Sequence, residues 1–270
     1  MAKIIFWNMD RRPLPELAAA LVTDHAVDLF LVAESDGTTA TLDAINAVTA
    51  GAFREEAGPR MDRIRIFSRL PLGAITPVSD PDGARIVRVA SQQGDVLLAA
   101  VHMRSMLFAD DNDQFSRCVL MKNAVSEAER QVDLDSRTVL VGDFNANPFD
   151  LGLIGTLGLH AVMSRDVASG GGREVDTAYY TFFYNPMWSF LGDHPPGAPP
   201  GSYYYPGKHC SSIWHIMDQV LVRPALLDRF STETVKVVHT AGTQSLLDER
   251  GRPARAWSSD HLPLVFELTI

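Results

Sequence analysis

The stretch Val141-Gly-Asp-Phe-Asn-Ala-Asn-Pro148 decides how the rest of the chain is interpreted. It continues the apolar run Thr138–Val141, which predicts a buried strand. Asp143 and Asn145 lie two positions apart, so they project the same way from an extended backbone. A carboxylate can accept a proton or hold a cation, and a carboxamide can donate to an anionic oxygen. The pair therefore suits an attack by water on a phosphate held near a metal.

Polar and ionisable residues also stand at or near the ends of the other predicted strands. Asn8 and Asp10 follow 3–7, Glu34 follows 28–33, His102 and Arg104 follow 96–101, Asp218 lies within 216–222, and Ser259, Asp260 and His261 precede 262–268. Burying several carboxylates together is costly unless a cation or hydrogen bonds offset the cost. Acids repeated at strand ends therefore favour a metal site.

These residues together resemble the motif series of the endonuclease/exonuclease/phosphatase family, the deoxyribonuclease I-like superfamily. The matching segments are Trp7-Asn-Met-Asp10, Glu34, His102, Gly142-Asp-Phe-Asn145, Asp218 and Ser259-Asp-His261, in the family's order. Arg65–Pro71 also resembles a structural strand and turn of the family. The resemblance implies a single α/β domain over residues 1–270: a four-layer sandwich, with two mixed β-sheets packed face to face and flanked by helices. The site is expected at one rim, where strand ends from both sheets meet.

The resemblance also implies a role for each residue at the phosphate. Asp143 is expected to be the general base or to orient the attacking water, and Asn145 to hydrogen-bond a phosphate oxygen. His261 is expected to donate to the phosphate, with Asp218 holding its ring in one tautomer and favouring the imidazolium. His102 is expected to contact the phosphate.

The remaining predicted roles concern the metal and further substrate contacts. Hard oxygen ligands suit Mg²⁺ or Mn²⁺. Glu34 is the first candidate ligand, with Asp10 and Asp260 as helpers. Asn8 would orient the metal-side carboxylate or touch the phosphate, and Arg104 is a second candidate phosphate contact.

Several of these residues have plainer alternatives. Asn8 alone could cap a strand end, and Asp10 could be a solvated turn residue. Arg104 could pair with Asp110 or Asp111. Ser259 is interpreted as a turn or supporting residue rather than a nucleophile, because no Gly-x-Ser-x-Gly turn accompanies it.

Helical apolar spacing predicts helices over residues 14–25, 38–50 and 114–132, and further strands are predicted over 63–68, 84–91 and 94–101. Residues 168–213 differ, because they are rich in aromatic residues, Pro and Gly, and they predict a long loop. Its rings either stack on substrate or form a small core of their own, and the second is favoured for Phe182, Phe183 and Trp188. Trp214 and His215 are expected to border the pocket.

Composition narrows the function further. The chain has 270 residues and a net charge of −9, from 24 basic and 33 acidic residues. It has no run of Lys or Arg, which counts against a high-affinity general binder of duplex DNA. The apolar runs are shorter than a membrane span, and the first residues lack a signal-peptide pattern, so a cytoplasmic location is expected. Two cysteines, Cys118 and Cys210, make a disulfide framework improbable.

The sequence thus predicts a divalent-metal-dependent phosphoesterase that uses direct water attack. A phosphodiesterase, specifically a nuclease, is preferred, with a nucleic acid, a nucleotide or a small phosphodiester as substrate. Three alternatives stay open: a phosphatase for monoesters, phospholipids or sugar phosphates; a noncatalytic binding module that keeps the fold; and, with little support, a serine hydrolase.

Overall fold

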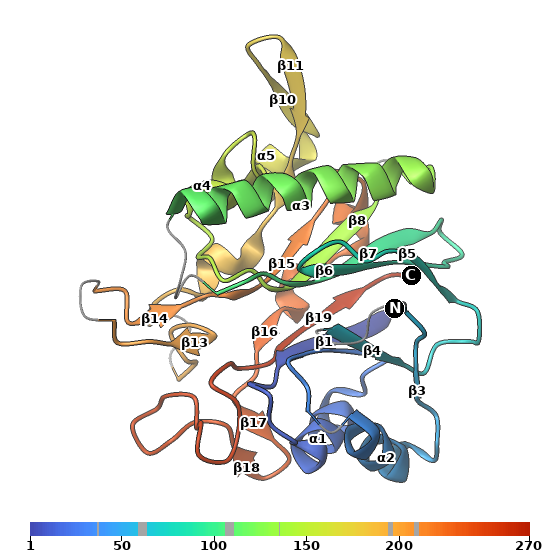
Figure 1. Cartoon of the computed structure of the whole chain (residues 1–270), viewed down its shortest axis with the longest axis vertical. Coiled ribbons are helices and arrows are strands. Elements are labelled where there is room, and N and C mark those ends of the chain that lie inside the picture. The colour runs from blue at the N-terminus through green and yellow to red at the C-terminus, as the bar shows by residue number, and fades with distance from the viewer. Residues whose placement is uncertain (37, 59–63, 106–110, 135, 194–196, 208–210) are drawn as a thin grey trace.

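Two β-sheets stack face to face, and helices cover their outer faces (Figure 1). The computed structural model describes the whole chain except residues 37, 59–63, 106–110, 135, 194–196 and 208–210. Cys210 and Asp110 therefore lie outside the described residues. Among the described residues, no helix combines the length and apolar character that crossing a membrane requires.

The first sheet holds both ends of the chain. Its strands, in spatial order, are β16 (Lys236–Val237), β19 (Leu264–Leu268), β1 (Ala2–Asn8), β2 (Leu29–Ala33), β4 (Ile64–Ser68) and β3 (Arg54–Glu55). β1 runs parallel to β2 and antiparallel to β19, so the sheet is mixed.

The second sheet is also mixed, because β7 runs parallel to β8 but antiparallel to β6. Its strands, in spatial order, are β5 (Ile75–Ser79), β6 (Ala84–Val89), β7 (Val96–His102), β8 (Thr138–Asp143), β15 (Asp218–Val222), β12 (Phe183–Tyr184) and β9 (Ala161–Val162).

Strand periodicity divides the core into layers. In β8, Val139 and Val141 belong to the apolar core between the sheets, whereas Leu140 belongs to the core beneath the long helix α3 (Asp111–Gln131). On the other side, α1 (Pro15–His25) and α2 (Thr38–Thr49) contribute to a third core against the first sheet. The predicted four-layer sandwich is confirmed.

Helices α1, α2 and α3 match the predicted segments to within a few residues. Cys118 is fully buried on α3, as a small apolar side chain would be. Strand β5 was not predicted; four of its five residues are only partly buried or exposed, and its register with β6 shifts between Pro77 and Ser79. The shorter helices are α4 (Leu151–Ile154) and α5 (Arg165–Ser169), with 3₁₀ turns η2 (Pro186–Phe190), η3 (Pro224–Arg229) and η4 (Thr232–Thr234).

The prediction of a long loop over residues 168–213 is wrong in part. The described residues of this segment form a hairpin of β10 (Gly172–Val175) and β11 (Ala178–Thr181), which projects at the top of Figure 1. They also include β12, η2 and β13 (Tyr203–Tyr204), which pairs with β14 (Trp214–His215). The final short hairpin is β17 (Thr240–Ala241) with β18 (Gln244–Ser245). Phe182 and Phe183 are buried and Trp188 is half-buried, so these rings pack against the protein rather than facing solvent.

Candidate active site

Strand periodicity aims four polar residues into the space between the two sheets. The residue two positions along each strand belongs to the apolar core between the sheets. These residues are Phe6, Ala100 and Val141, which come before the polar residue, and Val220, which comes after Asp218. The polar residues that face this same layer between the sheets are Asn8, His102, Asp143 and Asp218. The inter-sheet layer is therefore apolar along its length and polar at this one rim.

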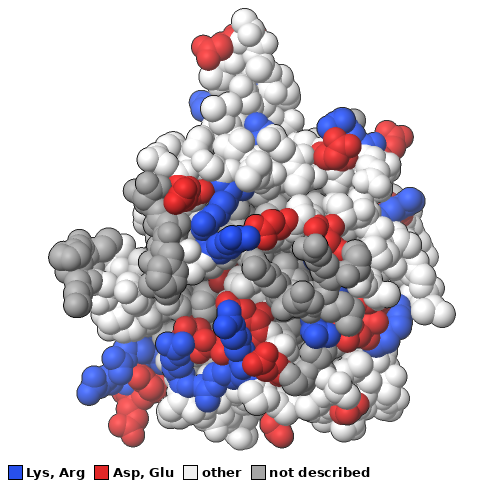
Figure 2. Space-filling view, viewed as in Figure 1, with Lys and Arg blue, Asp and Glu red and all other residues white. Residues whose placement is uncertain are grey.

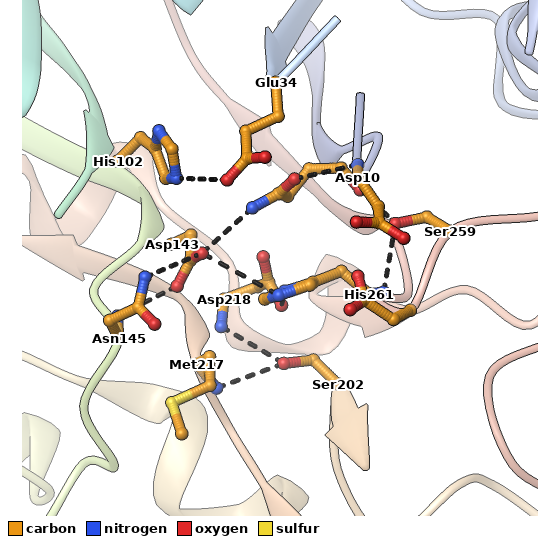
Figure 3. A network of polar contacts seen from close by, with 12 residues as sticks. Asp10, Glu34, His102, Asp143, Asn145, Ser202, Met217, Asp218, Ser259 and His261 are labelled. Carbon is orange, nitrogen blue, oxygen red and sulfur yellow. Dashed lines mark hydrogen bonds and ion pairs between the residues drawn. The ribbon is translucent and has the colours of Figure 1, made fainter. Parts of the chain in front are cut away.

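Strand register then sets these residues side by side. His102 on β7 lies opposite Asp143 on β8, and Asp143 lies opposite Asp218 on β15. Neighbouring strands are about 4.8 Å apart, so the three side chains form one row across the sheet. Figure 3 shows His102, Asp143 and Asp218 within one network of polar contacts. Asn8 reaches this row from the other sheet and donates from Nδ2 to Asp143 Oδ2 at 3.0 Å.

The Asp143 side chain is only 1% exposed, and several hydrogen-bond donors satisfy its carboxylate. Asn145 donates to it twice, from its backbone N to Oδ1 at 2.8 Å and from Nδ2 to Oδ2 at 3.1 Å. Asn145 Nδ2 also donates to the Met103 carbonyl at 2.8 Å, so in this structure Asn145 positions Asp143. Burial raises the pKa of the Asp143 carboxyl, and the nearby His261 acts in the opposite direction.

His261 and Asp218 form a buried hydrogen-bonded pair. His261 Nδ1 lies 2.8 Å from Asp218 Oδ2, and His261 Nε2 lies 3.8 Å from Asp143 Oδ2. Burial by itself would lower the pKa of His261, but the Asp218 and Asp143 carboxylates outweigh it and raise the pKa to about 10. The ring is therefore an imidazolium at neutral pH, with Nδ1–H donating to Asp218.

Two supports hold this pair. Ser202 Oγ accepts from the backbone N of Met217 and of Asp218, at 3.2 and 3.1 Å. Ser259 Oγ donates to the Asn8 carbonyl at 2.5 Å and accepts from the His261 backbone N at 3.1 Å. Ser259 is thus engaged on both sides, which agrees with a supporting residue rather than a nucleophile.

Glu34 directs its carboxylate toward His102 from the opposite sheet. His102 Nε2 lies 3.0 Å from Glu34 Oε1, and Arg11 Nε lies 3.2 Å from Oε2. The hydrogen bond from His102 lowers the pKa of Glu34 despite the cost of burial, so this acid is ionised at neutral pH. Glu34 has a left-handed φ of 48°, which is uncommon outside glycine and turns the chain directly after β2.

Asp10 and Asp260 face one arginine. Arg255 donates to both carboxylate oxygens of Asp10, at 2.8 and 3.1 Å, and its Nη2 lies 3.8 Å from Asp260. Burial, with Asp10 nearby, raises the pKa of Asp260. Asp10 is therefore more than a solvated turn residue, because it takes part in an ion pair at the site.

A main cleft of about 540 Å³ opens over these groups. Every predicted site residue except Asp218 lines it: Asn8, Asp10, Glu34, His102, Arg104, Asp143, Asn145, Asp260 and His261. Asp218 lies behind His261 and is fully buried. Arg104 pairs with Asp82 at 3.0 Å; Asp110 and the side chain of Asp111 lie outside the described residues.

Trp214 and His215 are not among the described residues that line the main cleft. Trp214 packs against the core under α1 and α2, and His215 Nδ1 lies 3.1 Å from Asn147 Nδ2. Their expected position at the pocket border is not supported.

Three residues at the site were not predicted. The Tyr203 ring lies 4.6 Å from the His261 ring, centroid to centroid, and burial raises the pKa of its hydroxyl to about 12. Arg11 and Arg255 pair with the acids of the cleft. No sequence signal distinguishes these residues, because Arg11 and Arg255 lie in loops and Tyr203 lies in the two-residue strand β13, which only the fold brings to the rim.

Among the described residues, Asp143, Asp218 and His261 offer ligand atoms that lie within 4.8 Å of one another, as a metal ion would require. The charges argue for a different use of this group. A doubly protonated imidazolium has no lone pair for a metal, and Asp218 Oδ2 already accepts its proton. The carboxylates of Glu34, Asp10 and Asp260 also line the cleft and offer the hard oxygens that Mg²⁺ and Mn²⁺ prefer.

Comparison with solved structures shows the same fold in several proteins. An endonuclease/exonuclease/phosphatase family protein from Leptotrichia buccalis aligns over 100% of both chains, with a TM-score of 0.59 and 10% identity. An AP endonuclease from Archaeoglobus fulgidus aligns over 100% of both chains, with a TM-score of 0.56 and 14% identity. TDP2 of D. rerio, complexed with a single-strand DNA product, aligns over 98% of this chain and 97% of its own, with a TM-score of 0.55 and 13% identity.

No curated protein matches the chain by sequence. The sequence profile of the Endonuclease/Exonuclease/phosphatase family, however, matches residues 5–261, which include both the first and the last strand-end motif. The recognition made from the motifs is thus confirmed, and the chain belongs to the Endonuclease/Exonuclease/phosphatase family of phosphoester hydrolases.

Proposed function

We propose that this protein is a divalent-metal-dependent phosphodiesterase of the nuclease type, which hydrolyses its substrate by direct attack of water. The observation that carries the proposal is that a buried acid, a charged imidazole and three further carboxylates meet at one cleft. Asp143 lies beside the His261 imidazolium, and Glu34, Asp10 and Asp260 line the same cleft. Phosphate hydrolysis needs a base, a proton donor and a site for a cation together.

Asp143 is suited to receive the proton of the attacking water. Its carboxylate is fixed by Asn8 and Asn145, so it has one orientation toward the cleft. Burial raises its pKa, which makes it a stronger base than a solvated aspartate. The water oxygen bonds to phosphorus as its proton passes to the carboxylate, and the ester oxygen departs on the opposite side.

His261 supplies the positive charge for the phosphate. Its Nδ1–H is committed to Asp218, so its Nε2–H faces Asp143 and the cleft. That N–H is placed to donate to a nonbridging phosphate oxygen as negative charge grows there in the transition state. Asn8 would add an amide donor, and His102 and Arg104 would contact the same phosphate from the wall of the cleft. Both hydrogens of Asn145 Nδ2 are already donated, so Asn145 would act by holding Asp143 in place.

Glu34 would be the principal ligand of Mg²⁺ or Mn²⁺, with Asp10 and Asp260 beside it. The donor set fits such an ion, because all three groups are carboxylates on the wall of one cleft and Glu34 is ionised. A bound divalent cation would neutralise the phosphate and stabilise the leaving oxygen. Arg255 and Arg11, which now balance these acids, would then be available to the substrate.

Two observations favour a diester over a monoester. The main cleft continues into a neighbouring pocket with which it shares four lining residues, so a phosphate bound in the cleft has room for a substituent on a further side. Among the structures of the same fold are an AP endonuclease and a TDP2 complex with a single-strand DNA product. Figure 2 shows basic and acidic residues side by side on the drawn face, which suits short or single-stranded substrates better than long duplex DNA.

Hydrolysis of a substrate panel tests the proposal. Plasmid, a single-stranded oligonucleotide, bis(p-nitrophenyl) phosphate and a set of phosphomonoesters are offered with Mg²⁺ or Mn²⁺. We expect diester cleavage by the wild type, and a loss of kcat of at least about 100-fold in Asp143→Asn and in His261→Ala.

Asp166→Asn, an exposed acid on α5, serves as the matched control and should keep the wild-type rate. Thermal unfolding of each variant separates lost chemistry from lost structure. Wild-type turnover in Asp143→Asn would refute the assignment of the base, and cleavage of monoesters alone would show a phosphatase.

A further inference from the structure

A side pocket of about 420 Å³ adjoins the main cleft. Tyr203, Tyr205, Arg255 and Asp260 line both cavities, so a molecule bound in one reaches directly into the other. Nothing in the hydrolytic mechanism uses the remainder of the side pocket.

Aromatic rings make up much of its wall. Tyr205 and Trp257 are 46% and 42% exposed, although large rings of this kind are usually covered. The Tyr203 and Tyr205 rings are nearly parallel, with an interplanar angle of 15° and centroids 6.5 Å apart. Rings that are exposed and held in place are ready to take a flat partner without a large loss of side-chain entropy.

Hydrogen bonds and ring contacts with the rest of the protein hold these aromatic residues in place. Trp257 Nε1 donates to the Ser245 carbonyl at 2.9 Å, and Tyr203 packs on the His261 ring at 4.6 Å. Tyr204 meets Trp214 edge to face at 5.3 Å, which holds β13 in place between Tyr203 and the adjoining Tyr205. The aromatic surface is thus a rigid feature continuous with the proton donor of the cleft.

Two guanidinium groups border the same surface. Arg255 stands at the boundary between the cavities, paired with Asp10. Arg252 pairs with Asp248 at 2.8 Å and lies 5.4 Å from the centroid of the Tyr204 ring. Planar guanidinium and aromatic groups together bind planar heteroaromatic groups by stacking and by hydrogen bonds at the ring edge.

We propose that the side pocket is a nucleobase subsite, which binds the base of the nucleotide next to the scissile phosphate. This inference rests on the proposed phosphodiesterase function and names its substrate as a nucleotide-bearing diester. An inositol, simple sugar or glycerol diester would leave the exposed Tyr205 and Trp257 rings without a flat π partner.

Two oligonucleotides of equal length test the subsite. One is a natural single strand, and the other carries stable abasic residues on both sides of one cleavable phosphodiester. Both keep the same backbone charge, so the ratio of their kcat/KM values isolates the contribution of the bases. We expect the wild type to prefer the base-bearing strand by about 10-fold or more, the range that stacking of a base on an aromatic ring supports.

The preference should fall to less than about 3-fold in Trp257→Ala and in Tyr205→Ala, because each removes part of the stacking surface. Trp257→Phe and Tyr205→Phe keep a ring and should keep most of the preference. Tyr179→Ala is the matched control: this ring is 64% exposed on the β10–β11 hairpin, far from both cavities, and its loss should leave the preference unchanged.

The outcomes separate the two proposals. A wild type that cleaves neither strand refutes the phosphodiesterase function. A wild type that cleaves both strands equally well, or a preference that survives in both alanine variants, refutes the subsite and leaves the function standing. Equal loss of activity on both strands in Trp257→Ala would show a structural role for that ring and would also overturn the subsite.

Discussion

At the scale of single residues, the site depends on one histidine whose charge is set by its neighbours. His261 is buried, which disfavours the imidazolium, yet two carboxylates within 4 Å reverse the effect. Because the folded-state pKa of about 10 lies above the ordinary value of 6.5, the charged ring stabilises the fold fully below pH 6.5. That stabilisation is lost as the pH rises through about 10.

Replacing Asp218 by Asn removes one of these two charges and keeps a hydrogen-bond acceptor. The pKa of His261 should fall, so the alkaline limb of the kcat/KM profile should move to lower pH by more than about one unit. The rate at pH 8 should drop by about 10- to 100-fold. A pH–rate profile between pH 6 and 10.5 measures both effects, and an unmoved alkaline limb would show that Asp218 does not control the charge of His261.

At the scale of elements, β8 places the base through a close approach between two strands. Gly142 precedes Asp143 and has a φ of +152°, and a Cβ added there would lie 1.9 Å from the Val101 carbonyl oxygen on β7. Only glycine allows the two strands to approach in this way. The glycine of the motif is therefore explained by strand packing rather than by chemistry.

Gly142→Ala should destabilise the protein by about 1–3 kcal/mol or more, because both strands are buried and neither backbone can move freely. Gly73→Ala is the matched control: it also has a positive φ of +81° but no atom within 4 Å of its added Cβ. Urea unfolding of the two variants separates the clash from the cost of the backbone conformation alone. Equal destabilisation of the two variants would mean that β7 and β8 move apart at little cost in free energy.

At the scale of the whole molecule, three acids from separate loops face one cleft, and we propose that they bind a common cation. Glu34 follows β2, Asp10 follows β1, and Asp260 precedes β19, all in the first sheet. In the structure, Arg11 and Arg255 pair with Glu34 and Asp10, and His102 Nε2 lies 3.0 Å from Glu34 Oε1. All three acids line the same cleft, which is where the proposed cation would bind.

Chelation with EDTA should abolish hydrolysis, and Mg²⁺ or Mn²⁺ should restore it. The same ions should raise the midpoint of thermal unfolding, because an ion that binds only the folded state stabilises it by mass action. Glu34→Gln should raise by about 10-fold the metal concentration needed for half-maximal activity and for half-maximal stabilisation. Asp166→Asn should leave both concentrations unchanged. Full activity in EDTA, with no shift in the unfolding temperature, would contradict the metal site.

Much of the fold and of the candidate site could be predicted, because each motif directly follows an apolar run and so marks where a strand ends. Apolar runs ending in Asn8, Glu34, His102 and Asp143 predicted which residues reach a sheet rim, and the period of two predicts which face they share. The loops gave no such signal. The short strands β10 and β11 were missed, since each has only four residues and these show no clear alternation of apolar and polar side chains.

The sequence by itself determined the family, the two-sheet sandwich and the identity of the acids and the imidazole, because these depend on local patterns of burial and on motif order. Only the tertiary structure decided which groups touch: that Asp218 holds His261, that arginines face Asp10 and Glu34, and that Tyr203 joins the site to the side pocket. These contacts join residues from distant parts of the chain. Their distances, and hence their pKa values, follow from how the two sheets and their loops pack rather than from any local pattern.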